Sequence, residues 1–192
     1  MDLAQLQQQQ RLLVRQKITA MVNRYVVTTE APGGGEGEFV ALVQQKRLAM
    51  KEQVTFYADE DRKQPLFGFR ARTVVDLGAS YDVTAADGSP IGSFRKDFTR
   101  SLLRSTWHLE QELGAGLTAV GKERRLPVAL ARRVVDLPFL FHFDFAVGDR
   151  TVMSVTKKLA LRDRYLVTIE EPALDRRLAI AMAVALDVLQ SR

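Results

Sequence analysis

Few side chains in this sequence could do chemistry, because its 192 residues include no cysteine and only two histidines. The missing thiols exclude disulfides, thiolate nucleophiles and zinc–thiolate sites. His108 and His142 each alternate with apolar residues, so we expect both on the non-core face of their strands, with Glu110 beside His108. No Ser-His-Asp arrangement or nucleophile elbow can be assigned. The sequence therefore predicts no catalytic site, no metal site and no cofactor.

Two glycine clusters, "GGGEG" and "LGAGLTAVG", could suggest phosphate loops. Neither has the Lys-Ser/Thr of a P-loop, and neither follows a strand and opens a helix at the spacing of a dinucleotide fingerprint. Both are interpreted as turns.

Basic residues are the remaining candidates for function, in a chain with a formal net charge of +5. They recur at the close of hairpin-like units, and strands of the same direction would bring them to one rim of a sheet. A ring of Lys and Arg there could bind phosphate-bearing lipid headgroups. The alternative is that these charges only solubilise the surface or protect edge strands. The candidate ligand-binding residues are Arg95, Lys96, Lys122, Arg124, Arg125, Lys157 and Lys158.

The elements that would position these residues are short alternating runs separated by turn signals, a pattern typical of antiparallel β proteins. The units "YDVTAADGSPIGSFRK" and "FHFDFAVGDRTVMSVTKK" each comprise a strand, a turn with Asp and Gly, and a second strand ending in a basic pair. About twelve strands are predicted, and so long a meander usually curls or closes to hide its edges. They are expected near 11–16, 23–29, 37–45, 53–58, 64–71, 80–85, 90–96, 105–111, 117–122, 139–146, 151–157 and 164–170.

The last segment is a helix, expected over 173–190, in which every residue from Leu178 to Leu186 is apolar. A membrane span needs about 20 apolar residues, whereas a run of about 10–14 favours a core helix. A helix that is apolar on all sides must be surrounded. A barrel of about twelve strands is too wide for its own side chains to fill. The sequence thus predicts a mainly β fold: a closed antiparallel barrel of about twelve strands enclosing a central hydrophobic C-terminal helix.

The length of the chain fits a single domain over 1–192. Within it, we expect residues 1–10 to be a flexible or helical lead and 126–138 to contain a short helix. The opening "MDLAQLQQQQRLLVRQ" lacks the basic and apolar regions of a signal peptide, so a cytoplasmic location is expected.

Several stretches together resemble the LURP-one-related and phospholipid-scramblase-like proteins, whose fold is similar to the tubby C-terminal domain. These are "LLVRQK", "FYADEDRKQPLFGFRAR", "YDVTAADGSPIGSFRK", "RSTWHLE" and "LRDRYLVTIEEPALDRRLAIAMAVALDVL". The resemblance implies a twelve-stranded antiparallel barrel around a hydrophobic C-terminal helix. Its members' functions vary: tubby domains bind phosphoinositides, scramblases are associated with calcium-dependent lipid movement, and plant members are linked to defence.

The chain departs from the scramblase pattern. It has neither the proline-rich extension nor the cysteine-rich palmitoylated stretch. Where scramblases carry an acidic calcium-associated segment, it reads "LRDRYLVTIEEPALD", in which Arg162 and Arg164 dilute the acids. Calcium needs several converging oxygen ligands, which adjacent guanidinium groups oppose. Calcium binding is therefore not expected.

The sequence as a whole favours a non-enzymatic LURP-one-related domain protein, in the cytoplasm or peripheral at a membrane, that binds anionic lipid headgroups or a protein partner. Nucleic acid is not expected, because exposed aromatic residues are not interleaved with the charges. The alternative is a membrane-associated scramblase that uses the C-terminal helix as a span.

Overall fold

Twelve strands and two helices form the part of the chain that the structure describes. The computed structural model describes residues 1–17, 22–46, 52–72, 80–97, 105–114, 116–124, 142–158 and 164–190. The strands are β1 (Arg11–Lys17), β2 (Arg24–Glu30), β3 (Glu36–Lys46), β4 (Gln53–Tyr57), β5 (Pro65–Ala71), β6 (Ser80–Ala85), β7 (Pro90–Lys96), β8 (Thr106–Gln111), β9 (Leu117–Glu123), β10 (His142–Val147), β11 (Arg150–Lys158) and β12 (Arg164–Ile169). The helices are α1 (Leu3–Gln7) and α3 (Arg176–Gln190).

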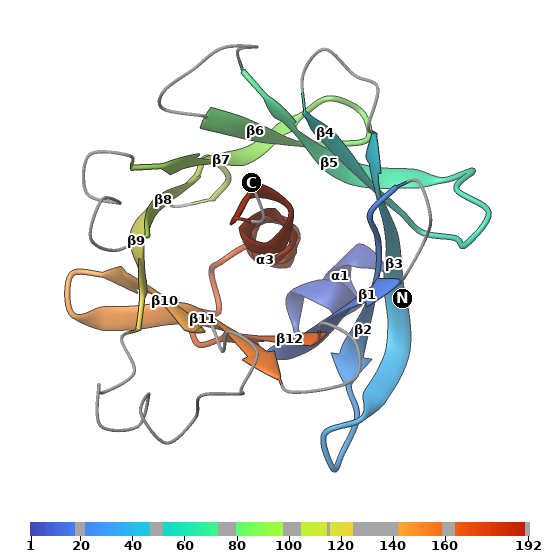
Figure 1. Ribbon diagram of the computed structural model, residues 1–192, viewed down its shortest axis with the longest axis horizontal. Helices are drawn as coiled ribbons and strands as arrows, with labels where there is room; N and C mark the ends of the chain where they lie inside the picture. The colour runs from blue at the N-terminus through green and yellow to red at the C-terminus, as the bar shows by residue number, and fades with distance from the viewer. Residues whose placement is uncertain are drawn as a thin grey trace.

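The strands close into one barrel around α3, as the sequence predicted (Figure 1). Each strand pairs antiparallel with its neighbours in sequence, and β1 closes the ring against β12. The expected strands all recur, and each end that can be compared lies within one residue of its expected position. The first part of the tenth expected strand, and the short helix expected within 126–138, lie outside the described residues.

Tight turns join the hairpins that the sequence repeats indicated. Gly88 between β6 and β7 has φ 86°, and Gly148 between β10 and β11 has φ 59°. These positive dihedral angles are strained for residues with a Cβ atom, which explains the glycine in each copy of the unit.

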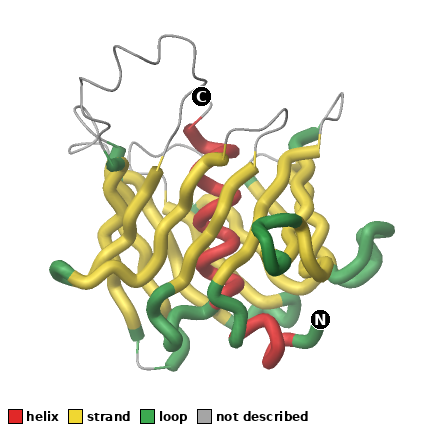
Figure 2. The backbone as a smooth tube through the Cα atoms, turned by 90° about the horizontal axis from the view of Figure 1, so that it is seen from below, coloured by secondary structure: helices red, strands yellow, loops and turns green. Residues whose placement is uncertain are grey.

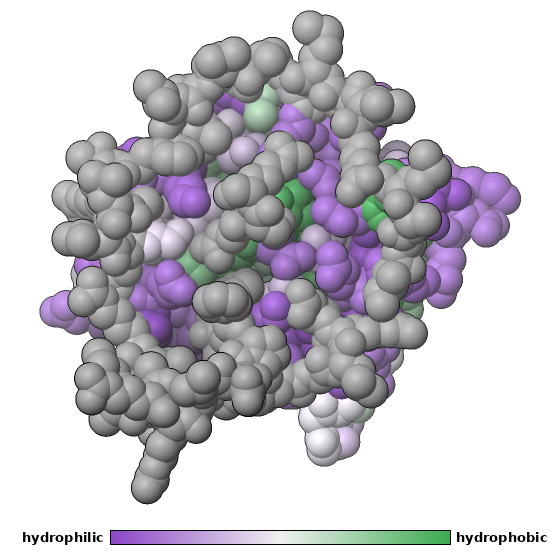
Figure 3. All heavy atoms as spheres, in the orientation of Figure 1, coloured by the Kyte–Doolittle hydropathy of each residue, from purple (hydrophilic) through white to green (hydrophobic). Residues whose placement is uncertain are grey.

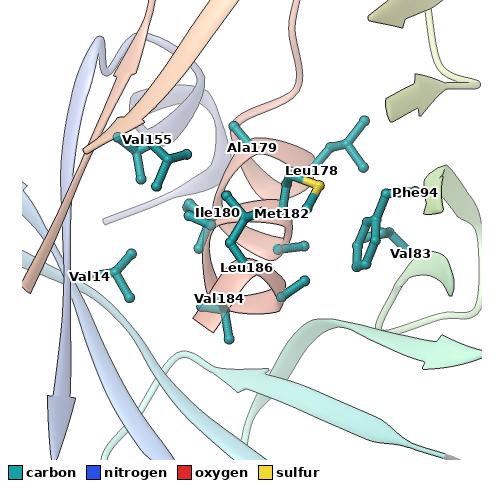
Figure 4. Packing of buried hydrophobic residues seen from close by; sticks show 14 of the residues in the cluster. Val14, Val83, Phe94, Val155, Leu178, Ala179, Ile180, Met182, Val184 and Leu186 are labelled. Atoms are coloured by element: carbon teal, nitrogen blue, oxygen red, sulfur yellow. The ribbon is translucent and has the colours of Figure 1, made fainter. Parts of the chain in front are cut away.

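The core lies between the barrel wall and α3. Every side chain from Leu178 to Leu186 is fully buried. Inward-facing residues such as Val14, Val83 and Val155 surround them (Figure 4). Because side chains alternate along a strand, one face of each strand supplies this core and the other forms the outer wall. The all-round apolar character of the helix thus matches an enclosure of apolar side chains on every side.

An aromatic row fills the barrel beside the slim, alanine-rich helix. Rings on β4, β5, β6, β7 and β8 contact one another in succession, from the stacked pair Phe56–Phe67, with centroids 4.2 Å apart, to Phe94–Trp107 at 6.2 Å. Large rings supply the volume that short strand side chains and alanines leave open.

The helix runs along the barrel from one rim to the other (Figure 2). We name the rim where α3 ends the C-terminal rim, and the rim where α1 lies and α3 begins the N-terminal rim. Because the strands alternate in direction, odd-numbered strands end at the C-terminal rim and even-numbered strands begin there. Among the described helices, none combines the length and the apolar character that a membrane span requires.

The N-terminal rim is closed by hydrogen bonds between α1, the barrel and the start of α3. The Gln7 amide donates to Asp175 at 2.9 Å and accepts from the backbone of Arg176 at 3.0 Å. The Gln111 side chain accepts from the Asp175 backbone at 2.7 Å and donates to the Ala173 carbonyl at 3.0 Å. These bonds pair polar groups that would otherwise be buried unsatisfied beneath α1.

We expect stability to fall in acid, partly through Asp175. Burial raises the pKa of Asp175, but hydrogen bonds from Arg177 and Gln7 outweigh it and hold the pKa below the ordinary 3.8. A lowered folded pKa contributes stability that is complete above the unfolded pKa and is lost as the pH falls through the folded value. Urea unfolding should therefore show a free energy that declines below about pH 4. Asp175→Asn should weaken that decline, whereas Asp61→Asn, in an exposed turn, should not.

Candidate anion-binding rim

The structure brings six of the seven candidate basic residues to the C-terminal rim. They lie at the ends of β7, β9 and β11, which run in the same direction, so the gathering follows from the strand order. In Figure 3, which views the molecule from this rim, hydrophilic residues surround hydrophobic ones wherever the grey atoms leave them visible. The seventh candidate, Arg125, lies outside the described residues.

Neighbouring basic residues at the rim point in opposite directions. Lys96 and Lys157 share the inward faces of their strands with Phe94 and Val155. The Nζ atom of Lys96 lies 5.9 Å from the ring centroid of Trp107, as in a cation–π contact. Lys157 lies 5.8 Å from the ring of Tyr165 in the same way. These two lysines therefore belong to the inner mouth of the barrel.

The outward-facing candidates differ in how their charges are compensated. Arg124 donates to Asp144 at 2.8 Å. Lys158 donates at 2.9 Å to Glu30, whose side chain is only 6% exposed. Arg95 and Lys122 are exposed and form no ion pair within the described ranges. Of the candidate residues on the outer side of the rim, Arg95 and Lys122 are thus the most available cations.

Glu30 shows how firmly Lys158 is held. Its carboxylate accepts hydrogen bonds from both Arg11 and Lys158, and these bonds lower the pKa of Glu30 below its ordinary 4.5. The Lys158 ammonium would have to leave this mostly buried carboxylate before it could bind a headgroup. Lys158 therefore contributes to the wall more than to a ligand site.

The inner mouth contains a polar cluster that the sequence analysis did not identify. Asp187, near the end of α3, accepts hydrogen bonds from the hydroxyls of Tyr25 (2.5 Å) and Tyr165. These tyrosines lie on β2 and β12, so the cluster ties the helix end to the wall on both sides of β1. Its signal in the sequence is Asp187 itself, the one acidic residue that interrupts the apolar run of the helix.

Both histidines lie on the outer wall, as expected. His108 bonds to Asp97 at 3.3 Å rather than to Glu110, its neighbour on the same face of β8. His142 lies between the Thr156 hydroxyl, 2.8 Å from Nδ1, and Asp144, 2.8 Å from Nε2.

The Thr156–His142–Asp144 chain has the residue types of a hydrolase triad in a different arrangement. In a serine hydrolase the hydroxyl bonds Nε2 and the carboxylate bonds Nδ1. Here the two nitrogens are exchanged, and Arg124 holds the second oxygen of Asp144. This geometry joins β9, β10 and β11 along the outer wall.

The acidic segment before α3 is engaged by arginine. Glu171 pairs with Arg150, and Asp175 with Arg177 at 2.7 Å. Within the described ranges, no three or more His, Cys, Asp or Glu residues gather as metal ligands would. Of the other two acids in the scramblase-like stretch, Glu170 is exposed and Asp163 lies outside the described residues.

Comparison with known proteins identifies the family of this chain. A search of curated proteins finds no match. The family model described as LURP-one-related matches residues 40–187, which run from β3 to near the end of α3 and include all the candidate rim residues. The chain therefore belongs to the LURP-one-related family.

Proposed function

We propose that this LURP-one-related protein acts without catalysis, as a domain that binds the phosphate-bearing headgroups of anionic lipids at its C-terminal rim. The observation that carries the proposal is the gathering of basic strand ends at that rim, where Arg95 and Lys122 have no ion-pair partner within the described ranges. The net charge of +5 supports encounter with an anionic surface.

The chemistry of the two outer cations suits a charged, multiply oxygenated group. Arg95 can offer a planar fork of N–H donors, and Lys122 a compact ammonium. Near an anionic membrane each such cation contributes about 1 kcal/mol of attraction, which falls off within a Debye length of about 10 Å. Binding would thus be weak for one residue and cumulative over the rim. It would place the protein at the cytoplasmic surface of a membrane.

Liposome co-sedimentation tests the proposal. The chain is expected to bind vesicles that contain phosphatidylserine or phosphoinositide at low salt, and to bind neutral phosphatidylcholine vesicles much less. The double variant Arg95→Gln with Lys122→Gln should weaken partitioning about 30-fold, the effect of losing about 2 kcal/mol.

A matched control distinguishes binding at the C-terminal rim from attraction caused by the net charge of the whole protein. Lys63→Gln with Arg150→Gln removes the same net charge from the N-terminal rim, where β4 ends and β11 begins. It should partition nearly as the unaltered chain does. Equal loss in both double variants would reject a site at the C-terminal rim. Absence of binding to anionic vesicles at low salt would reject the headgroup proposal and leave a protein partner as the alternative.

A further inference from the structure

A hollow on the outer wall, lined by none of the rim candidates, lies over β4, β5 and β6. These three strands are at the top of Figure 1. Its volume is about 550 Å³, within the range of small-molecule sites. We name it the outer groove and define it by six outward-facing residues that line it: Gln53, Thr55, Gly68, Arg70, Asp82 and Thr84.

Gly68 forms the floor of the outer groove. It lies in the middle of β5 and faces the outer wall, where any other residue would place a side chain. Thr55 on β4 and Thr84 on β6 lie directly opposite it in the strand register. A Cβ atom on Gly68 would lie 2.7 Å from the Val54 carbonyl oxygen, so the close approach of the backbones itself requires glycine. The floor is therefore bare backbone between two hydroxyl groups.

The next row of the register carries the charge. Arg70 lies opposite Gln53 on one side and Asp82 on the other. Asp82 is already bound by Arg72, with the guanidinium Nε 2.6 Å from its carboxylate. Arg70 is exposed and forms no ion pair within the described ranges. The outer groove thus offers one uncompensated guanidinium, with two hydroxyls and an amide as neutral groups beside it.

These side chains of the outer groove match a ligand with one negative charge and several hydroxyl groups. A guanidinium fork binds a carboxylate through two parallel hydrogen bonds. The Asp82 carboxylate beside it would repel a phosphate dianion more than a monoanion. The hydroxyls of Thr55 and Thr84 and the amide of Gln53 can both donate to and accept from ligand hydroxyls.

We propose that the outer groove binds a small hydroxy-carboxylate of the sugar-acid class, with its carboxylate on Arg70 and its hydroxyls over Gly68 between Thr55 and Thr84. This site is separate from the headgroup site proposed at the C-terminal rim, which involves β7 and β9. A failure of either proposal leaves the other standing.

Titration calorimetry of the full chain with gluconate, acetate, glucose and inorganic phosphate tests the assignment. Gluconate should bind best, because it alone presents both features. Arg70→Gln should weaken gluconate about tenfold or more, the loss expected when a charged hydrogen bond is removed. Thr55→Val with Thr84→Val should weaken gluconate but change acetate little, because these isosteric changes remove only the hydroxyls.

Arg150→Gln is the matched control for Arg70→Gln. It removes one exposed arginine from β11, the strand six positions away from β5 in the closed order. It should leave gluconate binding unchanged. Phosphate binding tighter than gluconate, an undiminished affinity in Arg70→Gln, or no gluconate binding at millimolar concentration would each overturn the proposal.

Discussion

Ala183→Asp is expected to unfold the chain or to lower its free energy of unfolding by several kcal/mol. Ala183 is fully buried in the middle of α3. Its sequence neighbours Met182 and Val184, labelled in Figure 4, are also fully buried. Small domains are stable by only about 5–15 kcal/mol, so a buried, unpaired carboxylate removes much of that margin.

Asp187 shows what a carboxylate needs in this helix. It lies four residues after Ala183, on the same helix face, and reaches the mouth of the barrel where Tyr25 and Tyr165 donate to it. An aspartate at 183 would lie about 6 Å deeper, where the wall supplies apolar side chains. It would also lie within repulsive reach of Asp187.

Thermal unfolding followed by circular dichroism measures the effect. Ala4→Asp is the matched control, because Ala4 is exposed in α1 and an acid near a helix start is tolerated. The control should unfold within a few degrees of the unaltered chain. An Ala183→Asp variant as stable as the control would contradict a sealed barrel interior around α3.

The barrel and its central helix could be predicted because both depend on local patterns. Alternation with period two marks each strand, glycine at positive φ marks the hairpins, and an all-round apolar helix demands an enclosure. The gathering of basic strand ends at one rim also follows from alternating strand direction alone. The contacts that these basic residues make could not be predicted in the same way.

What each rim residue does depends on partners that are distant in sequence. The alternation of side chains along a strand already implies that adjacent residues such as Arg95 and Lys96 face opposite sides, so only one of each pair could lie on the outer wall. That Lys158 is held by Glu30 depends on a contact across 128 residues. No local pattern contains it.

The outer groove also could not be predicted from local sequence patterns. "LFGFR" indicates a strand with one glycine, which by itself suggests only a bulge or a close approach. The hollow arises because the register places threonines opposite Gly68 on both sides and Arg70 beside an aspartate already bound by Arg72. Register between strands, rather than composition, creates that site.

Arg176→Met is expected to lower the free energy of unfolding by about 3–5 kcal/mol, the second large effect. In the sequence Arg176 is the first of two arginines before an apolar run, a position that usually faces solvent. In the structure it is 3% exposed, in the first turn of α3, where the helix dipole disfavours a cation. Burial lowers its pKa, against the opposing charges of Asp175 and Glu171.

Carbonyl oxygens hold the Arg176 guanidinium in place of a carboxylate. Nη1 donates to the carbonyls of Pro172 and Leu174, both at 2.7 Å, and Nε donates to the carbonyl of Gln9 at 2.8 Å. One side chain thus joins the N-terminal segment to the loop before α3 and seals the N-terminal rim. Methionine would preserve much of the volume but leave these acceptors without a donor, at about 1–3 kcal/mol each when buried.

Urea denaturation of three variants separates this role from an ordinary surface charge. Arg150→Met is the matched control, because Arg150 reaches the same loop through the Glu171 side chain but is exposed, and such ion pairs contribute at most about 1 kcal/mol. Arg176→Lys should lie between the two, since a single ammonium keeps the charge but cannot reach both Gln9 and the loop. A buried ion pair can be replaced by apolar groups at little cost because both partners leave together. Here the acceptors are backbone carbonyls that remain whatever replaces the arginine. Equal stability of Arg176→Met and Arg150→Met would therefore show that the hydrogen bonds of Arg176 do not help to close the rim.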